Sequence, residues 1–173
     1  MQDVGGLRIV SKVDLSGQDK IVSRIVDAFP NARLIDRRKN PKYGYRAVHV
    51  IAVLDERRIE IQIRTQLQDL WAQAIERLAD KAGREIRYGG TPQSCGEDVE
   101  TLLNFAADIA NVESYLTRLN KLRSNLPQPS RAAFNQRQMR LHLANVQSLR
   151  LEMIKQEESI LAKLSAIMDS GAA

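Results

Sequence analysis

The chain of 173 residues contains one cysteine, two histidines and no long hydrophobic run. Because the single cysteine, Cys95, has no partner within the chain, a disulfide scaffold is excluded and a reducing, cytoplasmic location is predicted. The apolar runs are only a few residues long, far short of the roughly 20 residues that a membrane-spanning helix needs. Gln2 and Asp3 follow Met1 without an apolar stretch, so no signal peptide is expected.

The composition is that of a folded protein, with 43% hydrophobic and 27% charged residues. These fractions exclude a disordered chain and a collagen-like repeat. The length allows one domain, or one domain with an extension, around a real hydrophobic core. We find no internal repeat and no low-complexity segment.

The positive charge is concentrated in the first half of the chain. Residues 1–96 contain 17 basic and 12 acidic residues, a net charge of +5, whereas residues 97–173 contain 9 of each. Residues 36–46 alone carry five basic residues and one acidic residue, together with Tyr43 and Tyr45. A solvated loop is one interpretation of this segment. A nucleotide-binding loop fits better, because arginine and lysine bind phosphates and tyrosine offers a face to a base.

Strand and helix patterns alternate in the first 65 residues. Ile59, Ile61 and Ile63 alternate with polar residues, which predicts a strand with one face in the core. Residues 45–54 predict a central strand, joined to it as a hairpin by a turn at 55–57. Two further strands are predicted at 4–13 and 33–36. A helix between these two is predicted from a capping box of Ser16 and Asp19 and from an apolar face of Ile21, Val22, Ile25, Val26 and Phe29.

The rest of the chain reads as helical. Thr65 and Gln68 predict the cap of a helix that Gly83 ends, with an apolar stripe of Leu67, Leu70, Trp71, Ala74 and Leu78. After an irregular segment, a second helix is predicted over 97–123, with a stripe of Val99, Leu102, Leu103, Ala106, Ile109, Leu116 and Leu119. A break at 124–129 precedes a third helix over 130–168, with a stripe of Val146, Leu149, Met153, Ile160, Leu164 and Ile167. This last stripe packs on the preceding helix or, alternatively, joins two subunits as a homo-oligomer.

Three polar residues share the face of the predicted strand that is turned away from the isoleucines. They are Glu60, Gln62 and Arg64, and the hairpin connects them to the tyrosine-containing basic segment. A solvated sheet face explains the alternation equally well. Together, however, a carboxylate, cations and an aromatic ring are the groups that nucleotidyl or phosphoryl transfer needs.

These residues resemble the RelA/SpoT-type alarmone synthetases. The resemblance rests on Asp3–Val10 (DVGGLRIV), on Gly44–His49 (GYRAVH) and on Glu60–Thr65 (EIQIRT), and the helix with Trp71-Ala72 and Glu76 follows the same pattern. It covers roughly residues 1–80. It implies an α+β fold, a mixed β-sheet flanked by helices of the nucleotidyltransferase type, with a C-terminal helical extension. The expected organisation is a synthetase domain at 1–83, a loop at 84–96 and a helical region at 97–173.

The resemblance also implies an activity. The family transfers pyrophosphate from ATP to the 3′-hydroxyl of GDP or GTP, making (p)ppGpp, the signal of the bacterial stringent response. Asp3 and Glu60 would bind Mg²⁺ as a pair, and Glu60 would also help to remove the hydroxyl proton. Tyr45 would stack on the acceptor base, and Asp69 would lie near the guanine edge. The remaining substrate-binding residues implied by the motifs are Lys39, Lys42 and Arg46 for the acceptor phosphates, His49 as the family's active-site histidine, and Gln62 and Arg64 on the same surface.

The sequence departs from the family pattern in three places: at its N-terminus, at Arg77 after Glu76, and at Tyr43 in the loop before Tyr45. The basic segment that holds ATP in the family lies before the motif of Asp3, whereas here only Met1 and Gln2 precede it, so the synthetase domain is expected to be incomplete at its N-terminus. Two alternatives therefore stand beside the synthetase hypothesis. One is a toxin-like enzyme, with an antitoxin partner, that pyrophosphorylates the 3′ end of tRNA. The other is a catalytically silent nucleotide-binding or regulatory module.

Several functions are excluded by what the sequence contains. His49 and His142 alone cannot assemble a metal-dependent His-Asp hydrolase site, so alarmone breakdown is not expected. A membrane or duplex DNA would need a broader basic footprint than residues 36–46 provide, so neither is expected as a partner.

Overall fold

The computed structural model describes residues 5–90 and 96–124, together with ten single positions between 144 and 166. Four strands, three α-helices and one 3-10 helix lie in the described ranges 5–90 and 96–124. In chain order they are β1 (Gly5–Ser11), α1 (Leu15–Ala28), β2 (Arg33–Asp36), β3 (Val48–Leu54), β4 (Arg57–Thr65), α2 (Gln66–Ala82), the 3-10 helix η1 (Arg84–Tyr88) and α3 (Gly96–Ser124).

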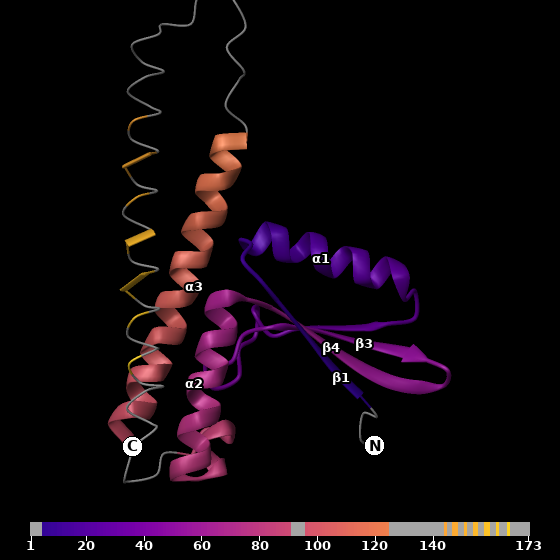
Figure 1. Ribbon diagram of the computed structural model, residues 1–173, viewed down its shortest axis with the longest axis horizontal. Helices are drawn as coiled ribbons and strands as arrows, with labels where there is room; N and C mark the ends of the chain where they lie inside the picture. Colours follow the sequence, from indigo (N-terminus) through magenta and orange to yellow (C-terminus); the bar gives the residue numbers. More distant parts are fainter. Residues whose placement is uncertain are drawn as a thin grey trace, which may run out of the picture.

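The strands form one mixed sheet in the order β1-β4-β3-β2. β1 runs parallel to β4, while β3 is antiparallel to both β4 and β2. The turn between β3 and β4 places Asp55 and Glu56 at φ angles of 47° and 63°, as a two-residue hairpin turn requires. The predicted α+β fold with a mixed sheet flanked by helices is confirmed (Figure 1).

Helix α1 covers one face of the sheet (Figure 1). The isoleucines of β4 and the even-numbered residues of β3 point toward it, because side chains alternate between the two faces of a strand. The buried residues of this core are Val22, Val48, Val50, Ala52, Ile61 and Ile63, and the predicted stripe of α1 packs on them. The opposite face of the sheet is not covered by α1, so its side chains are available for a site.

Helices α2 and α3 form a second core beside the sheet. Trp71 is buried at its centre and donates its indole N–H to the carbonyl of Leu102, at 2.6 Å. The predicted stripe of α2 and most of that of α3 lie in this core. Leu119 and Leu103 lie outside this core, and Leu103 is 40% exposed to solvent. Its place in the predicted stripe was therefore wrong.

Two predicted element boundaries also need correction. The N-cap of α1 is Asp14, whose carboxylate accepts a hydrogen bond from the backbone N–H of Gly17 at 2.8 Å, and not Ser16. β3 begins at Val48 rather than at residue 45, because the chain makes a tight turn with Tyr43 and Gly44 at positive φ. The capping box of Thr65 and Gln68 and the end of α2 at Gly83 are confirmed.

Other predictions lie outside the described residues. These are the placement of Asp3, Cys95 and His142, and the apolar stripe of the last predicted helix. The domain boundaries at 83 and 96 stay predictions, although α3 shares its core with α2. Among the helices of the described residues, none is long and apolar enough to cross a membrane.

Candidate active site

The open face of the sheet carries the polar residues that the sequence singled out. Glu60 and Gln62 on β4 lie beside Ile51 and His49 on β3, and beside Gly6 and Arg8 on β1. Tyr45 reaches this face from the loop before β3, and Asp69 reaches it from α2. Loop, strands and helix therefore converge on one surface.

Glu60 is the central carboxylate of this surface. Its Oε1 lies 2.6 Å from Nδ1 of His49, and its Oε2 accepts a hydrogen bond from the amide of Gln62 at 3.1 Å. Burial on its own would raise the pKa of Glu60, but the hydrogen bonds from His49 and Gln62 and the positive charge of Arg64 outweigh it. The pKa of Glu60 therefore lies below its ordinary value, and the group is an ionised carboxylate at neutral pH.

A chain of hydrogen bonds leads from Glu60 to Arg64. Nε2 of His49 lies 3.0 Å from the hydroxyl of Tyr45, and that oxygen accepts from Nη2 of Arg64 at 3.0 Å. Since Arg64 can only donate, the Tyr45 hydroxyl is free to donate to His49, whose other nitrogen then donates to Glu60. Both ring nitrogens of His49 thus have a partner, and the imidazole holds the Glu60 carboxylate in one orientation.

Arg64 also contacts the face of the Tyr45 ring. The guanidinium carbon lies 5.2 Å from the centroid of the ring, within the range of a cation–π contact. A second nitrogen of Arg64 donates to Oδ1 of Asp69 at 2.9 Å. The Tyr45 ring is thus held between the sheet and α2 in a defined position.

Asp69 is engaged within the protein. Its Oδ1 bonds to Arg64, and its Oδ2 accepts from the amide of Gln73 at 2.7 Å. Arg8 approaches more loosely, at 3.7 Å. Asp69 thus holds Arg64 in place, and the guanine contact that the motif implied stays a prediction. Gln73 was missed, although its spacing of four residues from Asp69 on a helix is a usable signal.

The basic residues of the loop do not all face the same way. Lys39 and Lys42 are exposed. Arg46 points to the side of the sheet that α1 covers, where it donates to the carbonyl of Arg38 at 3.0 Å and lies 3.6 Å from a carboxylate oxygen of Glu113. The structure therefore brings together Glu60, His49, Tyr45, Gln62, Arg64 and Asp69, and places Arg46 elsewhere.

Glu113 of α3 is the centre of a buried polar cluster that sequence reasoning missed. Only 3% of it is exposed, and it accepts hydrogen bonds from the hydroxyl of Thr65 and the amide of Gln68. Burial raises the pKa of Glu113 above its ordinary value. The amide of Gln68 also bonds to Gln18 of α1, so the cluster joins α1, α2, α3 and the loop.

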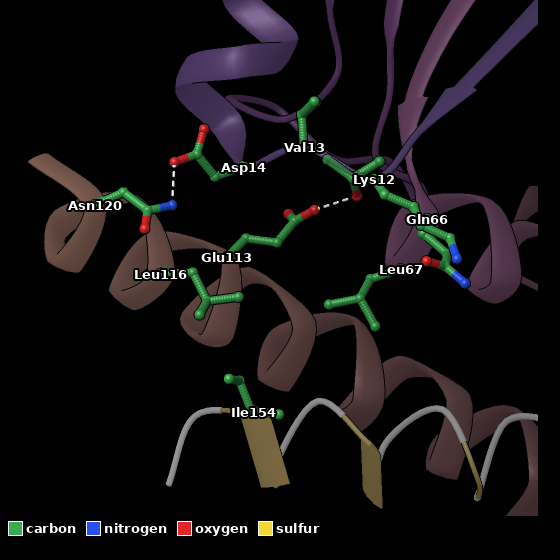
Figure 2. Close-up of a pocket in the computed structure, with 10 residues that line it drawn as sticks. Lys12, Val13, Asp14, Gln66, Leu67, Glu113, Leu116, Asn120 and Ile154 are labelled. Carbon is green, nitrogen blue, oxygen red and sulfur yellow. Dashed lines mark hydrogen bonds between the residues drawn. The ribbon is translucent and has the colours of Figure 1, made fainter. Parts of the chain in front are cut away.

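A cavity of about 320 Å³ adjoins this cluster. Figure 2 shows Glu113 turned into it, with Lys12, Asp14 and Asn120 around the rim and Leu67, Leu116 and Ile154 on the apolar side. The amide of Asn120 donates to Asp14 at 2.7 Å. The cavity lies on the side of α1 and α3, away from Glu60.

One predicted metal ligand lies on the described surface. Glu60 keeps free lone pairs on both oxygens and is partly exposed, so its donor chemistry fits Mg²⁺. Asp3, the other member of the predicted pair, lies outside the described residues. Within residues 5–90 and 96–124 there is no group of three or more His, Cys, Asp or Glu side chains that could hold a metal ion. The predicted magnesium pair thus stays a prediction.

Comparison with known proteins shows which family and which fold this chain resembles. Residues 1–82 match the family described as "Region found in RelA / SpoT proteins". A structure of a GTP pyrophosphokinase family protein from Streptococcus pneumoniae is 25% identical, with a TM-score of 0.52, and the match covers 75% of this chain and 66% of that one. The small alarmone synthetase 1 from Bacillus subtilis is 22% identical over 72% of this chain and 66% of that one, with a TM-score of 0.48.

The curated relatives add similarity in sequence. An uncharacterized protein of Mycobacterium tuberculosis strain H37Rv is 44% identical over 101 residues, which are 57% of this chain and 37% of the relative. The chain thus spans little more than a third of the curated relatives that it matches. The fold is shared with the structure of the GTP pyrophosphokinase family protein. The match of residues 1–82 to the RelA/SpoT region agrees with the resemblance that the motifs predicted.

Proposed function

We propose that this chain is a GTP/GDP pyrophosphokinase, which transfers pyrophosphate from ATP to the 3′-hydroxyl of GDP or GTP and so makes (p)ppGpp. The observation that carries the proposal is the chain of contacts from Arg64 through Tyr45 and His49 to Glu60. It holds an aromatic ring and an ionised carboxylate on one partly open surface. The RelA/SpoT region at 1–82 and the fold of the GTP pyrophosphokinase family support the same reaction.

In the proposed reaction, the acceptor 3′-oxygen forms a bond to the β-phosphorus of ATP. The bond from that phosphorus to the oxygen bridging the α- and β-phosphates breaks, and AMP leaves. The hydroxyl proton passes to Glu60, whose pKa below the ordinary value keeps it ready to accept. Tyr45 would stack on the acceptor base, and the exposed Lys39 and Lys42 would attract its phosphates.

Mg²⁺ is the proposed cofactor. Glu60 and Asp3 would hold it, and when bound it would neutralise the charge of the donor phosphates. Arg64 and Gln62, which bond to each other, would orient the two groups that touch substrate, Tyr45 and Glu60. A cytoplasmic location is part of the proposal and follows from the single cysteine.

Two alternative functions remain distinct from this proposal. Pyrophosphorylation of the 3′ end of tRNA uses the same carboxylate with another acceptor, and an exposed basic loop suits an RNA backbone. A catalytically silent module would bind nucleotide on the same sheet face without transferring pyrophosphate.

One assay separates the three functions. The protein is incubated with Mg²⁺ and ATP labelled on the γ-phosphate, in parallel with GDP, GTP and deacylated tRNA. Label in a guanosine tetra- or pentaphosphate supports the proposal, and label in tRNA alone supports the tRNA-modifying enzyme. No labelled product, with nucleotide binding intact, supports the silent module.

A further inference from the structure

β4 begins with two adjacent arginines that point to opposite faces of the sheet. Arg58 lies two residues before Glu60 and shares its face, whereas Arg57 lies on the side of the isoleucines. Both are exposed. Within residues 5–90 and 96–124, neither guanidinium takes part in an ion pair. The two cations thus differ in the face they occupy and in little else.

Arg58 and Tyr45 lie on opposite sides of Glu60. Along β4, Arg58 is about 7 Å from Glu60 toward the hairpin turn, because residues two apart in a strand are separated by twice the rise of 3.3 Å. Tyr45 and Arg64 lie toward the other end of the strand, where α2 begins. The Glu60 carboxylate therefore lies between the ring of Tyr45 and the guanidinium of Arg58.

The surface beside Glu60 on the neighbouring strand is bare. Gly6 of β1 is the register partner of Glu60, and an added Cβ there would meet no atom within 4 Å. Packing within the described residues therefore does not require a glycine at this position. What the glycine does provide is room, about 4.8 Å from β4, for a ligand to approach the backbone next to the carboxylate.

An in-line transfer needs donor and acceptor on opposite sides of the reacting phosphorus. If the acceptor base stacks on Tyr45, the donor phosphates must come from the side of Arg58 and Gly6. A guanidinium binds phosphate through two parallel hydrogen bonds and suits this position. We infer that Arg58 binds the phosphates of the donor nucleoside triphosphate, which lie over Gly6 beside Glu60. This inference rests on the proposed function.

The test compares Arg58→Ala with Arg57→Ala in the full chain. Isothermal titration calorimetry measures the affinity for a non-hydrolysable ATP analogue with Mg²⁺, and separately for GDP. We expect Arg58→Ala to weaken the analogue about 10- to 100-fold, as loss of hydrogen bonds to a charged group does, and to leave GDP unchanged. Arg57→Ala should change neither affinity. Circular dichroism checks that each variant is folded. If Arg58→Ala does not fold, Arg58→Gln replaces it in the comparison.

A second matched pair tests the bare surface. Gly6→Val fills the space beside Glu60, whereas Gly5→Val adds the same side chain on the opposite face. The inference predicts weaker binding of the ATP analogue for Gly6→Val alone.

Each contrary outcome has a distinct meaning. Equal affinity of Arg58→Ala and Arg57→Ala for the analogue would overturn the assignment of Arg58 and leave the proposed function standing. An equal loss of GDP and analogue affinity in Arg58→Ala would overturn its assignment to the donor. Wild-type protein that binds neither nucleotide would overturn the proposed function, and the inference with it.

Discussion

Nδ1 of His49 lies 2.6 Å from Oε1 of Glu60, and the other ring nitrogen lies 3.0 Å from the hydroxyl of Tyr45. The imidazole therefore links the carboxylate to the aromatic ring. In the proposed reaction these two residues serve different substrate groups, the 3′-hydroxyl and the base. Their connection through one histidine sets the distance between the two, and it can be tested residue by residue.

His49→Ala is expected to change the pH dependence of the transfer reaction. The hydrogen bond from His49 lowers the pKa of Glu60, so its loss raises that pKa toward the ordinary value. Because the reaction needs ionised Glu60, the acid limb of kcat/KM should move to higher pH in the variant. Initial rates across the acid range measure the limb. An acid limb at the wild-type position would contradict the role given to His49.

Tyr45→Ala should weaken GDP binding, and Tyr45→Phe should not. The phenylalanine variant keeps the ring and loses the hydroxyl that bonds to His49 and Arg64. Loss of the ring should cost about 1–3 kcal/mol of binding free energy, the usual value of base stacking. Calorimetric titration with GDP measures both, and Tyr88→Ala, at an exposed tyrosine outside the site, is the control. If Tyr45→Ala binds GDP like the wild type, the ring is not the platform.

Gly44→Ala should destabilise the fold and with it the placement of Tyr45. Gly44 has a φ of +80°, and a Cβ added there would lie 2.6 Å from Cζ2 of Trp71. Backbone strain and overpacking together should lower the free energy of unfolding by about 2 kcal/mol or more. Urea unfolding measures the change. Gly5→Ala, where an added Cβ meets nothing, should leave the free energy within about 0.5 kcal/mol. Equal stability of the two variants would show that the loop is not docked on Trp71.

Glu113→Gln should remove a component of the pH dependence of stability. Burial raises the pKa of Glu113 above its ordinary value of 4.5, so the folded state binds this proton more tightly than the unfolded state does. The free energy of unfolding contributed by Glu113 is therefore full below that ordinary value, and it falls as the pH rises toward the raised pKa. Glutamine does not titrate, so the decline should be smaller in the variant. Denaturant unfolding at a series of pH values measures the decline of the free energy of unfolding. An unchanged decline in the variant would show that other groups cause it.

Local patterns were enough to predict most of the fold. The alternation of Ile59, Ile61 and Ile63 gave β4 and its buried face, and Thr65 with Gln68 gave the start of α2. Such signals lie within a few residues of one another, so a single sequence carries them. The start of β3 was missed because Tyr45–Ala47 have strand-like side chains, while the positive φ of Tyr43 and Gly44 closes a turn before them.

The site could be predicted as a set of residues but not as a set of contacts. Motif spacing singled out Glu60, His49 and Tyr45, which the fold does bring together. The partner of Arg46 was not predictable, because Glu113 lies 67 residues further along the chain on α3. The bond between Arg64 and Asp69 likewise became visible only in the fold, and the guanine contact of Asp69 stays a prediction. Contacts between residues far apart in the sequence depend on how the helices pack, and no local sequence pattern predicts that packing.

In the proposed reaction Glu60 accepts the proton of the 3′-hydroxyl, so the transfer depends on its carboxylate. The rate of label transfer from γ-labelled ATP to GDP is measured for wild type, Glu60→Gln and Glu56→Gln, the last at an exposed carboxylate of the hairpin turn. We expect a loss of at least about 100-fold for Glu60→Gln and none for Glu56→Gln. A transfer rate in Glu60→Gln equal to that of the wild type would show that Glu60 is not the catalytic carboxylate.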